Sequence, residues 1–338
     1  MTAPIPDRLV ADVETPAWLY NESTILGNLE GIRELIDGLD VRLLFPLKCF
    51  TQRPALETMS PLLDGWAASS PFEARLAREL ATPEQTVQAT SPCIRPDDVK
   101  SIAADSDLIA CNSLHQLKQV EGTSASLGLR INPGLSFIDD ERYDPCRPGS
   151  KLGVPLQQLP ETGFDGFLVH THCESETLLP LRQTLQHIDR ERPDLLPRMK
   201  WINLGGGYLF NQAEDPDTFK RTIDDIRQRS EATLYIEPGW DVVGNAGCIV
   251  SSVVDLFDNE PHRVAVLDTS INHLPEVLEF DYSPEAKDAE DDAPHEYLLS
   301  GATCLAGDVF GAYRFHEAIE VGSRVVFLDC GAYSMVKA

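Results

Sequence analysis

The chain has 338 residues, of which 42% are hydrophobic, and its 54 acidic against 28 basic residues give a net charge of -26 at pH 7. This length and apolar content allow a large core, so we expect one large domain and a smaller one. The negative charge argues against binding to nucleic acid or anionic lipid, and no apolar stretch is long enough to span a membrane.

Strand-like and helix-like segments alternate through the first two thirds of the chain. The strand-like runs are Val41–Leu47, Gly65–Ser69, Thr86–Thr90, Asp107–Cys111, Leu127–Ile131, Phe164–His170, Lys200–Leu204 and Thr233–Glu237. The helix-like stretches are Pro71–Leu80, Pro96–Ala104, Leu114–Glu121, Thr177–Arg190 and Pro216–Arg229, and several of them begin with proline. Eight strands that alternate with helices predict parallel pairing and a closed α/β barrel of the (β/α)8 TIM type.

After Gly239 the sequence becomes β-rich and has no long helix-like stretch. The strand-like runs there are Cys248–Phe257, Arg263–Asp268, Tyr297–Ser300 and Ser323–Asp329, and the acidic stretch Tyr282–Pro294 predicts a solvated loop. We therefore expect the barrel over residues 25–245 and a smaller β-sandwich or β-barrel domain over residues 246–338. We expect residues 1–24 to join the β domain.

Targeting and metal binding have little support in the sequence. Met1-Thr2-Ala3-Pro4-Ile5-Pro6 has neither the basic start nor the apolar core of a signal peptide, so we expect a cytoplasmic protein. The eight cysteines include no C-x-x-C pair, which argues against a zinc site and against a disulfide framework. The acidic surface either attracts a cationic substrate or serves solubility, for example in a salty cytoplasm, and both interpretations stay open.

Chemically active residues stand at the ends of several predicted barrel strands. They are Lys48, Ser69, Arg130, His170, the triplet Gly205, Gly206 and Gly207, and Glu237. The carboxyl ends of the strands carry the active site in such barrels, so these residues would lie on one rim. Each has an ordinary alternative explanation: a lysine at a strand end can simply reach solvent, and a glycine triplet is often a flexible turn. The prediction of a shared rim rests on the order and spacing of these residues, and not on any one of them.

The residue types on this rim suggest pyridoxal phosphate as a cofactor. A lysine amine can form a Schiff base with an aldehyde, and a bare glycine turn lets backbone N–H groups approach a phosphate. Glu237 is the candidate to keep the pyridine nitrogen protonated. His170 completes a strand, so it is better placed than His172 to stack on the ring.

Longer motifs extend over nearly the whole chain from Thr15 onward. The more specific ones are Tyr143-Asp144-Pro145-Cys146 and Thr303-Cys304-Leu305-Ala306-Gly307-Asp308; the others are Ala68–Leu76, Gly128–Pro133, Pro148–Gly153, Asn203–Gly207 and Tyr333–Lys337. In these motifs the chain resembles the fold type III pyridoxal-phosphate decarboxylases of the alanine-racemase-like barrel group. Within that group it is most similar to the carboxynorspermidine and carboxyspermidine decarboxylases.

The resemblance implies roles for individual residues. Lys48 would carry the cofactor, His170 would stack on it, Glu237 would pair with the pyridine nitrogen, Gly205, Gly206, Gly207 and Tyr333 would hold the phosphate, and Ser69 and Arg130 would support it. Asp268 would face the distal amine of the substrate, and Cys173 and Asp308 would also contact the substrate. His172 and Trp240 are further candidates for substrate binding, but both depart from the family pattern: many members carry an arginine or glutamate at the position of Trp240, and the closest relatives usually have an apolar residue at that of His172. Cys304 and Asp308 would cross the interface of a homodimer to complete the partner's site, with Cys304 as an acid.

The implied function is decarboxylation of a substrate with a 3-amino-3-carboxypropyl group, in first place carboxynorspermidine or carboxyspermidine of polyamine biosynthesis. One alternative is the same reaction on a peptide-nucleotide or other natural-product scaffold, for which Trp240 could offer an aromatic platform. A noncatalytic carrier of pyridoxal phosphate would not need the β-rich half. An amino-acid racemase generally avoids a carboxylate on the pyridine nitrogen, so Glu237 favours decarboxylation.

Overall fold

The computed structural model describes residues 6–337, which divide into two compact units. We call residues 26–241 the barrel unit, and the residues up to 25 together with those from 242 onward the sheet unit. Residues 1–5, on which the expectation about a signal peptide rests, and residue 338 lie outside the described part. No helix within the described residues is long and apolar enough to cross a membrane.

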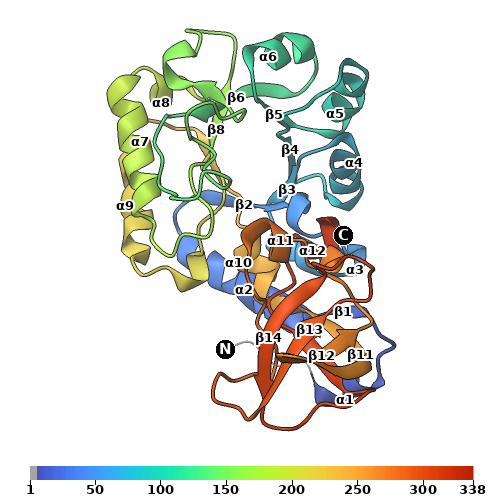
Figure 1. Cartoon of the computed structure of the whole chain (residues 1–338). Helices are drawn as coiled ribbons and strands as arrows, with labels where there is room; N and C mark the ends of the chain where they lie inside the picture. Colours follow the sequence, from blue (N-terminus) through green and yellow to red (C-terminus); the bar gives the residue numbers. More distant parts are fainter. Residues whose placement is uncertain (1–5, 338) are drawn as a thin grey trace. The chain divides into compact units, whose positions relative to one another are not determined.

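The barrel unit contains a closed ring of parallel strands (Figure 1). The strands are β2 (Val41–Pro46), β3 (Gly65–Ala68), β4 (Thr86–Ala89), β5 (Leu108–Cys111), β6 (Ser126–Asn132), β8 (Gly166–Val169), β9 (Trp201–Asn203) and β10 (Thr233–Ile236). Each pairs with the next, and β10 pairs with β2, so no edge is left open; β7 (Val154–Pro155) is a short addition beside β6. The predicted (β/α)8 barrel is confirmed. Six predicted strands ran one residue past the observed carboxyl end, and in four of them a polar residue that follows the strand was counted with it: Ser69, Thr90, His170 and Glu237.

Helices surround the ring on its outside (Figure 1). They are α2 (Glu22–Ile36), α3 (Arg53–Met59), α4 (Pro71–Leu80), α5 (Val99–Asp105), α6 (Leu114–Val120), α7 (Leu179–Glu191), α8 (Leu195–Arg198) and α9 (Pro216–Arg227). The start of α4 illustrates how local sequence sets these boundaries. Ser70 accepts a hydrogen bond from the Glu73 N–H, and the Glu73 carboxylate accepts one from the Ser69 N–H. This capping box, followed by Pro71, ends β3 and begins the helix at the rim.

Trp201 fills much of the space beside β6 and β8. A Cβ atom on Gly166 would lie 2.1 Å from the Trp201 ring, and one on Gly128 would lie 2.4 Å from it. Only glycine therefore fits at these two strand positions. The indole N–H donates to the Ser126 hydroxyl at 3.0 Å, so the buried polar group is satisfied. The barrel is packed rather than open along its length.

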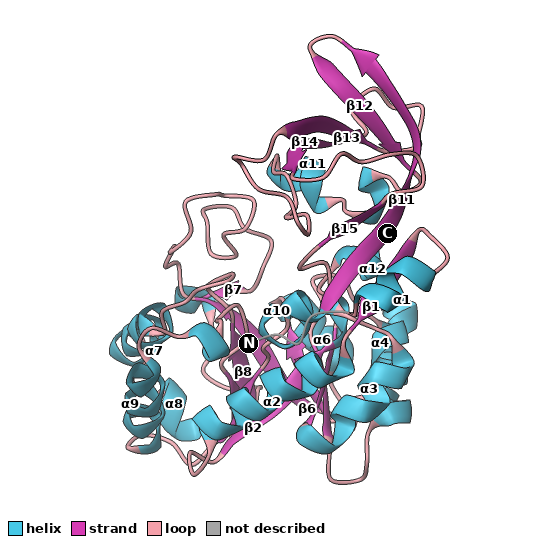
Figure 2. Cartoon of the chain, turned by 90° about the horizontal axis from the view of Figure 1, so that it is seen from below, coloured by secondary structure: helices cyan, strands magenta, loops and turns pink. Residues whose placement is uncertain are grey.

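The sheet unit is a six-stranded mixed sheet, which confirms the β-rich second part. Its strands are β1 (Ala17–Tyr20), β11 (Gly247–Asn259), β12 (His262–Leu267), β13 (His295–Ser300), β14 (Val309–Phe315) and β15 (Arg324–Phe327), and its short helices are α1 (Asp7–Asp12), α11 (Glu276–Phe280) and α12 (Ser334–Lys337). The long strand β11, prominent in Figure 2, pairs with β1, β12 and β15. Only the β12–β13 pair is parallel.

Three features of the sheet unit differ from the sequence-based expectation, and the first is that strand β1 was not predicted. Strand β14 was not predicted, although its residues alternate between buried and exposed, because Gly311 and the short run masked the pattern. The acidic stretch 282–294 is irregular as expected, but it is not wholly solvated. Ala286 and Ala293 are buried, and Ala286 and Ala289 form isolated bridges to Phe327 and Phe315. Small residues therefore attach this acidic loop to the sheet.

Candidate active site

A cavity of about 230 Å³ lies at the carboxyl ends of the barrel strands. Its lining includes six of the predicted rim residues: Lys48, Ser69, Arg130, His170, Gly205 and Glu237. Pro46, Ala67, Ala68, Thr90, Pro92 and Leu168 complete the lining. Residues that are as much as 189 positions apart in the sequence, from Lys48 to Glu237, thus meet at one end of the ring.

Lys48 is the only lysine among the residues that line this cavity. It lies in the short turn Leu47–Cys49 after β2, between two buried neighbours, and its own side chain is exposed. The Cys49 thiol donates to the Pro46 carbonyl at 3.0 Å, which fixes the turn. Within the described residues the Lys48 amine has no hydrogen bond or ion pair. It is thus available for a bond to a ligand.

The glycine turn after β9 packs directly against its neighbours. A Cβ atom on Gly206 would lie 2.0 Å from the Glu237 carbonyl oxygen, and one on Gly207 would lie 1.9 Å from the His172 carbonyl oxygen. Gly205 and Gly207 also have φ angles of 71° and 86°, which side chains disfavour. The three glycines are therefore required by space and by conformation, and they leave bare backbone at the cavity.

His170 is held as a neutral ring. Its Nδ1 accepts a hydrogen bond from the Gly206 N–H at 3.3 Å, so in the neutral form the ring proton lies on Nε2. Burial, together with the positive charges of Lys48 and Arg130, brings the pKa of His170 well below its usual value. An uncharged, flat face therefore borders the cavity at neutral pH.

Glu237 is a buried carboxyl with one fixed partner. The Asn203 side chain donates to Glu237 at 2.5 Å and to Gln88 at 2.9 Å, so the orientation of the carboxyl is set by strand β9. Burial raises the pKa of Glu237, although Lys48, Asn203 and Arg130 oppose this shift. A further cation at the carboxyl would be stabilised here. The sequence motif contained Asn203, but its role was missed because it depends on the facing strand.

Arg130 lies within β6 and is largely buried, and burial lowers its pKa. Its guanidinium forms no hydrogen bond or ion pair within the described residues, and the Glu237 carboxyl opposes the lowering of its pKa only in part. A buried guanidinium without a partner is costly, so this position favours an anionic ligand.

The loop after His170 carries further side chains to the same end of the barrel. The His172 ring stacks on Phe137 with centroids 6.2 Å apart, and it contacts Tyr208 at 6.0 Å. The Cys173 thiol is exposed and donates to the Tyr143 carbonyl at 3.6 Å. The long β6–β7 connection, which contains Phe137 and Tyr143, is thereby attached to this loop.

Two predicted substrate-binding carboxylates belong to the sheet unit and are engaged there. Asp268 accepts hydrogen bonds from Ser251, the Ser252 N–H and Thr15. Asp308 accepts hydrogen bonds from the Ile271 N–H and from both the N–H and the hydroxyl of Thr303. Burial would raise the pKa of Asp268, but the hydrogen bonds outweigh it and the pKa is lowered. Both carboxylates shape the loops around them, and a contact with substrate stays a prediction.

The other predicted site residues of the sheet unit lie at its surface or at a chain turn. Cys304 is an exposed free thiol in the loop that Asp308 organises. Tyr333 has a φ of 63° and immediately precedes α12. Trp240 belongs to the barrel unit; it is partly exposed and begins α10 (Trp240–Val243).

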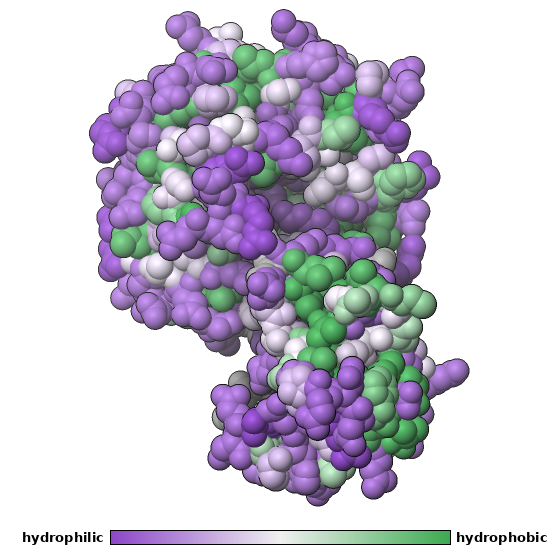
Figure 3. Space-filling model, in the orientation of Figure 1, coloured by the Kyte–Doolittle hydropathy of each residue, from purple (hydrophilic) through white to green (hydrophobic). Residues whose placement is uncertain are grey.

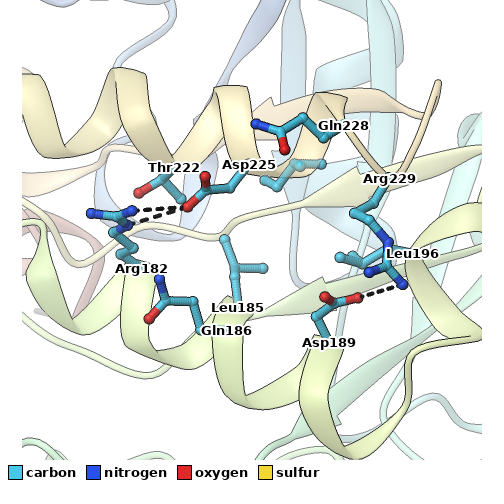
Figure 4. Close-up of a pocket in the computed structure, with 10 residues that line it drawn as sticks. Arg182, Leu185, Gln186, Asp189, Leu196, Thr222, Asp225, Gln228 and Arg229 are labelled. Atoms are coloured by element: carbon cyan, nitrogen blue, oxygen red, sulfur yellow. Dashed lines mark hydrogen bonds and ion pairs between the residues drawn. The ribbon is translucent and has the colours of Figure 1, made fainter.

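A second cavity, of about 240 Å³, lies on the outer helices of the barrel unit (Figure 4). Arg182 of α7 pairs with Asp225 of α9 at 3.1 Å, and Asp189 of α7 pairs with Arg229 at 3.2 Å. All four charges are thus neutralised within the groove. None of its lining residues belongs to the barrel strands or to the residues predicted for the active site.

An acidic group with a histidine occurs on the sheet unit. Glu290, Asp292 and His316 bring possible ligand atoms within 4.8 Å of one another, and all three are exposed. His316 is hydrogen-bonded to Glu290 at 3.0 Å, and this contact raises the pKa of the imidazole. The hydrogen bond accounts for the grouping without a metal ion.

Comparisons with known proteins agree with this geometry. Residues 9–331 match the family model described as "Pyridoxal-dependent decarboxylase, C-terminal sheet domain". The chain is 35% identical to the carboxyaminopropylagmatine decarboxylase of Synechocystis sp., covering 97% of this chain and 87% of that protein. It is 31% identical to the carboxynorspermidine/carboxyspermidine decarboxylase of Herminiimonas arsenicoxydans, covering 96% and 90%.

A solved structure has the same fold over nearly the whole chain. It is the carboxynorspermidine decarboxylase of Campylobacter jejuni complexed with norspermidine, with a TM-score of 0.85 and 28% sequence identity. The match covers 96% of this chain and 90% of that one.

Proposed function

The chain belongs to the family of pyridoxal-dependent decarboxylases, and we propose that it removes the α-carboxylate from a 3-amino-3-carboxypropyl group carried by a polyamine or by agmatine. The observation that carries this proposal is the cavity in which Lys48, His170 and Glu237 meet. Relatives that span almost the whole chain act on carboxynorspermidine, carboxyspermidine or carboxyaminopropylagmatine, according to their names. These substrates share the reacting group and differ in the cationic chain attached to it.

The residues around the cavity fit pyridoxal 5'-phosphate. The glycine turn presents backbone without side chains beside the cavity, so a phosphate can approach it closely. Glu237 is a buried carboxyl that a protonated pyridine nitrogen would stabilise. Lys48 supplies an unpaired amine for covalent attachment. When bound, pyridoxal phosphate supplies an electron sink for the electron pair that remains when carbon dioxide leaves.

Each residue around the cofactor would then have a separate role in the reaction. Lys48 would hold the cofactor through Nζ, and the neutral His170 ring would lie against its face without adding charge. Glu237, oriented by Asn203, would hold a proton at the pyridine nitrogen. Arg130 would pair with an anionic group of the cofactor or the substrate. Cys304 would deliver a proton to the α-carbon after decarboxylation.

Carbon dioxide release from a substrate panel tests the proposed function. The panel contains carboxynorspermidine, carboxyspermidine, carboxyaminopropylagmatine, ornithine, lysine and diaminopimelate. We expect kcat/KM for at least one of the first three to exceed that for the simple amino acids by about 100-fold. An enzyme that shows the absorption band of bound cofactor but releases nothing from the panel would contradict the proposal.

We further propose a homodimer in which the sheet unit of one subunit completes the site of its partner. Exposed apolar side chains of the sheet unit support this: Leu278 of α11, Val336 of α12 and Leu305 beside Cys304. Figure 3 displays apolar surface over α11 and α12, whereas the visible face of the barrel unit is mostly polar. Apolar surface of this kind is typical of an interface.

Complementation between inactive variants tests the shared site. Lys48→Ala and Cys304→Ala proteins should each be inactive, and mixing them should restore up to about a quarter of the wild-type activity, because half of the subunits enter hybrids and each hybrid has one intact site. Subunit exchange is monitored by native mass spectrometry. Exchange without recovered activity would show that each site is built within one subunit.

A further inference from the structure

Glu174 has an unusual backbone conformation at the rim of the barrel. It follows β8 by five residues, and its φ is 52°, in the left-handed region that side chains disfavour. Such strain persists only where the surrounding structure enforces it, and it concentrates at functional sites. Asp40, Asp281, Asp288, Asp329 and Tyr333 also have a positive φ, so the conformation gains meaning at Glu174 only from its place beside the glycine turn.

The backbone on both sides of Glu174 is fastened to the glycine turn. The His172 carbonyl oxygen lies so close to Gly207 that a Cβ atom on this glycine would be only 1.9 Å from it. The Ser175 N–H donates to the Gly207 carbonyl at 2.9 Å, and the Leu209 N–H donates to the Ser175 carbonyl at 2.8 Å. Glu174 is thus presented from a rigid position beside the proposed phosphate site.

Glu174 also differs from the other carboxylates around the site in having no partner. Glu237 is bound by Asn203, Glu73 by the Ser69 N–H, and Asp144 by the Cys146 N–H. Within the described residues the Glu174 carboxylate has no hydrogen bond or ion pair. Its surface is accessible, yet surrounding atoms crowd it enough that burial raises its pKa. A cation bound at this carboxylate would stabilise its negative charge.

The position of Glu174 suits the far end of a substrate. Glu174 stands four residues beyond His170, which lines the cavity together with Lys48, and Glu174 is not itself among the lining residues. Glu174 therefore lies outside the cavity, on the loop that leaves its rim after His170. A substrate attached at Lys48 could extend past Cys173 and place a charged end there.

We propose that Glu174 binds the distal cation of the substrate, an alkylammonium or a guanidinium group, and so helps to determine specificity. This inference rests on the proposed function, since it assigns the part of the substrate that does not react. The carboxylate would form a charge-assisted hydrogen bond with either cation. It would discriminate against substrates that lack the cationic chain, because Glu174 would then keep its negative charge without a partner.

Steady-state kinetics of Glu174→Gln test the proposal. For carboxynorspermidine or carboxyaminopropylagmatine we expect KM to rise about 10- to 100-fold with kcat changed less than about threefold, since one charge-assisted contact is lost. For 2,4-diaminobutyrate, which has the reacting group but no distal chain, kcat/KM should stay unchanged. Comparison of the two cationic substrates shows whether the ammonium, the guanidinium or both use this contact.

Two variants control for charge and for folding. Glu176→Gln removes the same charge from an exposed side chain of the same loop, and it should leave KM unchanged. Glu174→Gly removes the carboxylate together with the backbone strain, so it should lose affinity without a lower melting temperature. Equal losses for the long and the truncated substrate, or equal effects of the 174 and 176 variants, would overturn the proposal.

Binding distinguishes a failure of this inference from a failure of the proposed function. If the wild-type holoenzyme decarboxylates none of these substrates, the proposed function fails. Calorimetric measurement of norspermidine binding then tests separately whether Glu174 contacts a cationic ligand. Weaker binding to the Glu174→Gln holoenzyme than to wild type and to Glu176→Gln supports the contact. Equal binding by all three, or none by the wild type, rejects it.

Discussion

Replacing Lys48 by alanine is expected to abolish decarboxylation, by about four orders of magnitude or more, and to remove covalently attached cofactor. The physical reason is that Lys48 is the only lysine among the cavity residues, and its amine has no competing partner in the described part of the chain. Arg130 is the other cation of the cavity, but a guanidinium does not replace an amine in this attachment. Carbon dioxide release and visible absorbance measure the two effects.

Lys200→Ala provides the matched control. Lys200 directly precedes β9, so it stands at the amino end of the barrel strands, where it pairs with Asp165 at 2.9 Å. Its loss should leave activity and absorbance intact. Borohydride reduction of the wild-type enzyme followed by peptide mass spectrometry identifies the attached lysine directly. A label on any lysine other than Lys48 would disprove the assignment.

Gly207→Ala is expected to prevent cofactor binding and to destabilise the barrel by about 3 kcal/mol or more, since overpacking and a left-handed φ act together. The added Cβ atom would lie 1.9 Å from the His172 carbonyl oxygen, and neither backbone segment can move without breaking the hydrogen bond between Ser175 and Gly207. Urea denaturation gives the loss of stability, and titration with pyridoxal phosphate gives the loss of affinity.

Gly163→Ala separates the effect of a close Cβ contact from the effect of a left-handed φ. Gly163 has a similar φ of 97°, but a Cβ atom there meets nothing within 4 Å. The substitution should therefore cost only about 1–2 kcal/mol of backbone strain and leave cofactor affinity unchanged. Similar losses in both variants would mean that strain alone is responsible, and the close packing of the glycine turn would lose its proposed role.

The barrel could be predicted from sequence because each strand is short, apolar and followed by a helix start with its own local signal. The capping box at Ser70 and Glu73 is such a signal, and it needs no knowledge of the rest of the chain. Strand β14 was missed because Gly311 interrupts its apolar alternation, and the sheet partners that stabilise it are distant in sequence.

Some features of the candidate site could likewise be predicted from the sequence, and others could not. The rule that strand ends meet on one rim was enough to bring Lys48, His170 and Glu237 together. The function of Asn203 follows from its contact with a neighbouring strand, and the strain at Glu174 follows from how its loop is fastened. The hydrogen bonds that occupy Asp268 are likewise set by tertiary contacts, so residue type alone gave an incomplete account.

The packing of Gly206 links two residues that line the cavity, His170 and Glu237. Its N–H donates to the His170 ring, while its Cα faces the Glu237 carbonyl so closely that no side chain fits. Substitutions at these three positions should therefore be strongly non-additive, because a change in one shifts the other two. An effort to evolve new substrate preferences would then find few tolerated changes there. The exposed segment around Cys173 and Glu174 is the better place to introduce diversity.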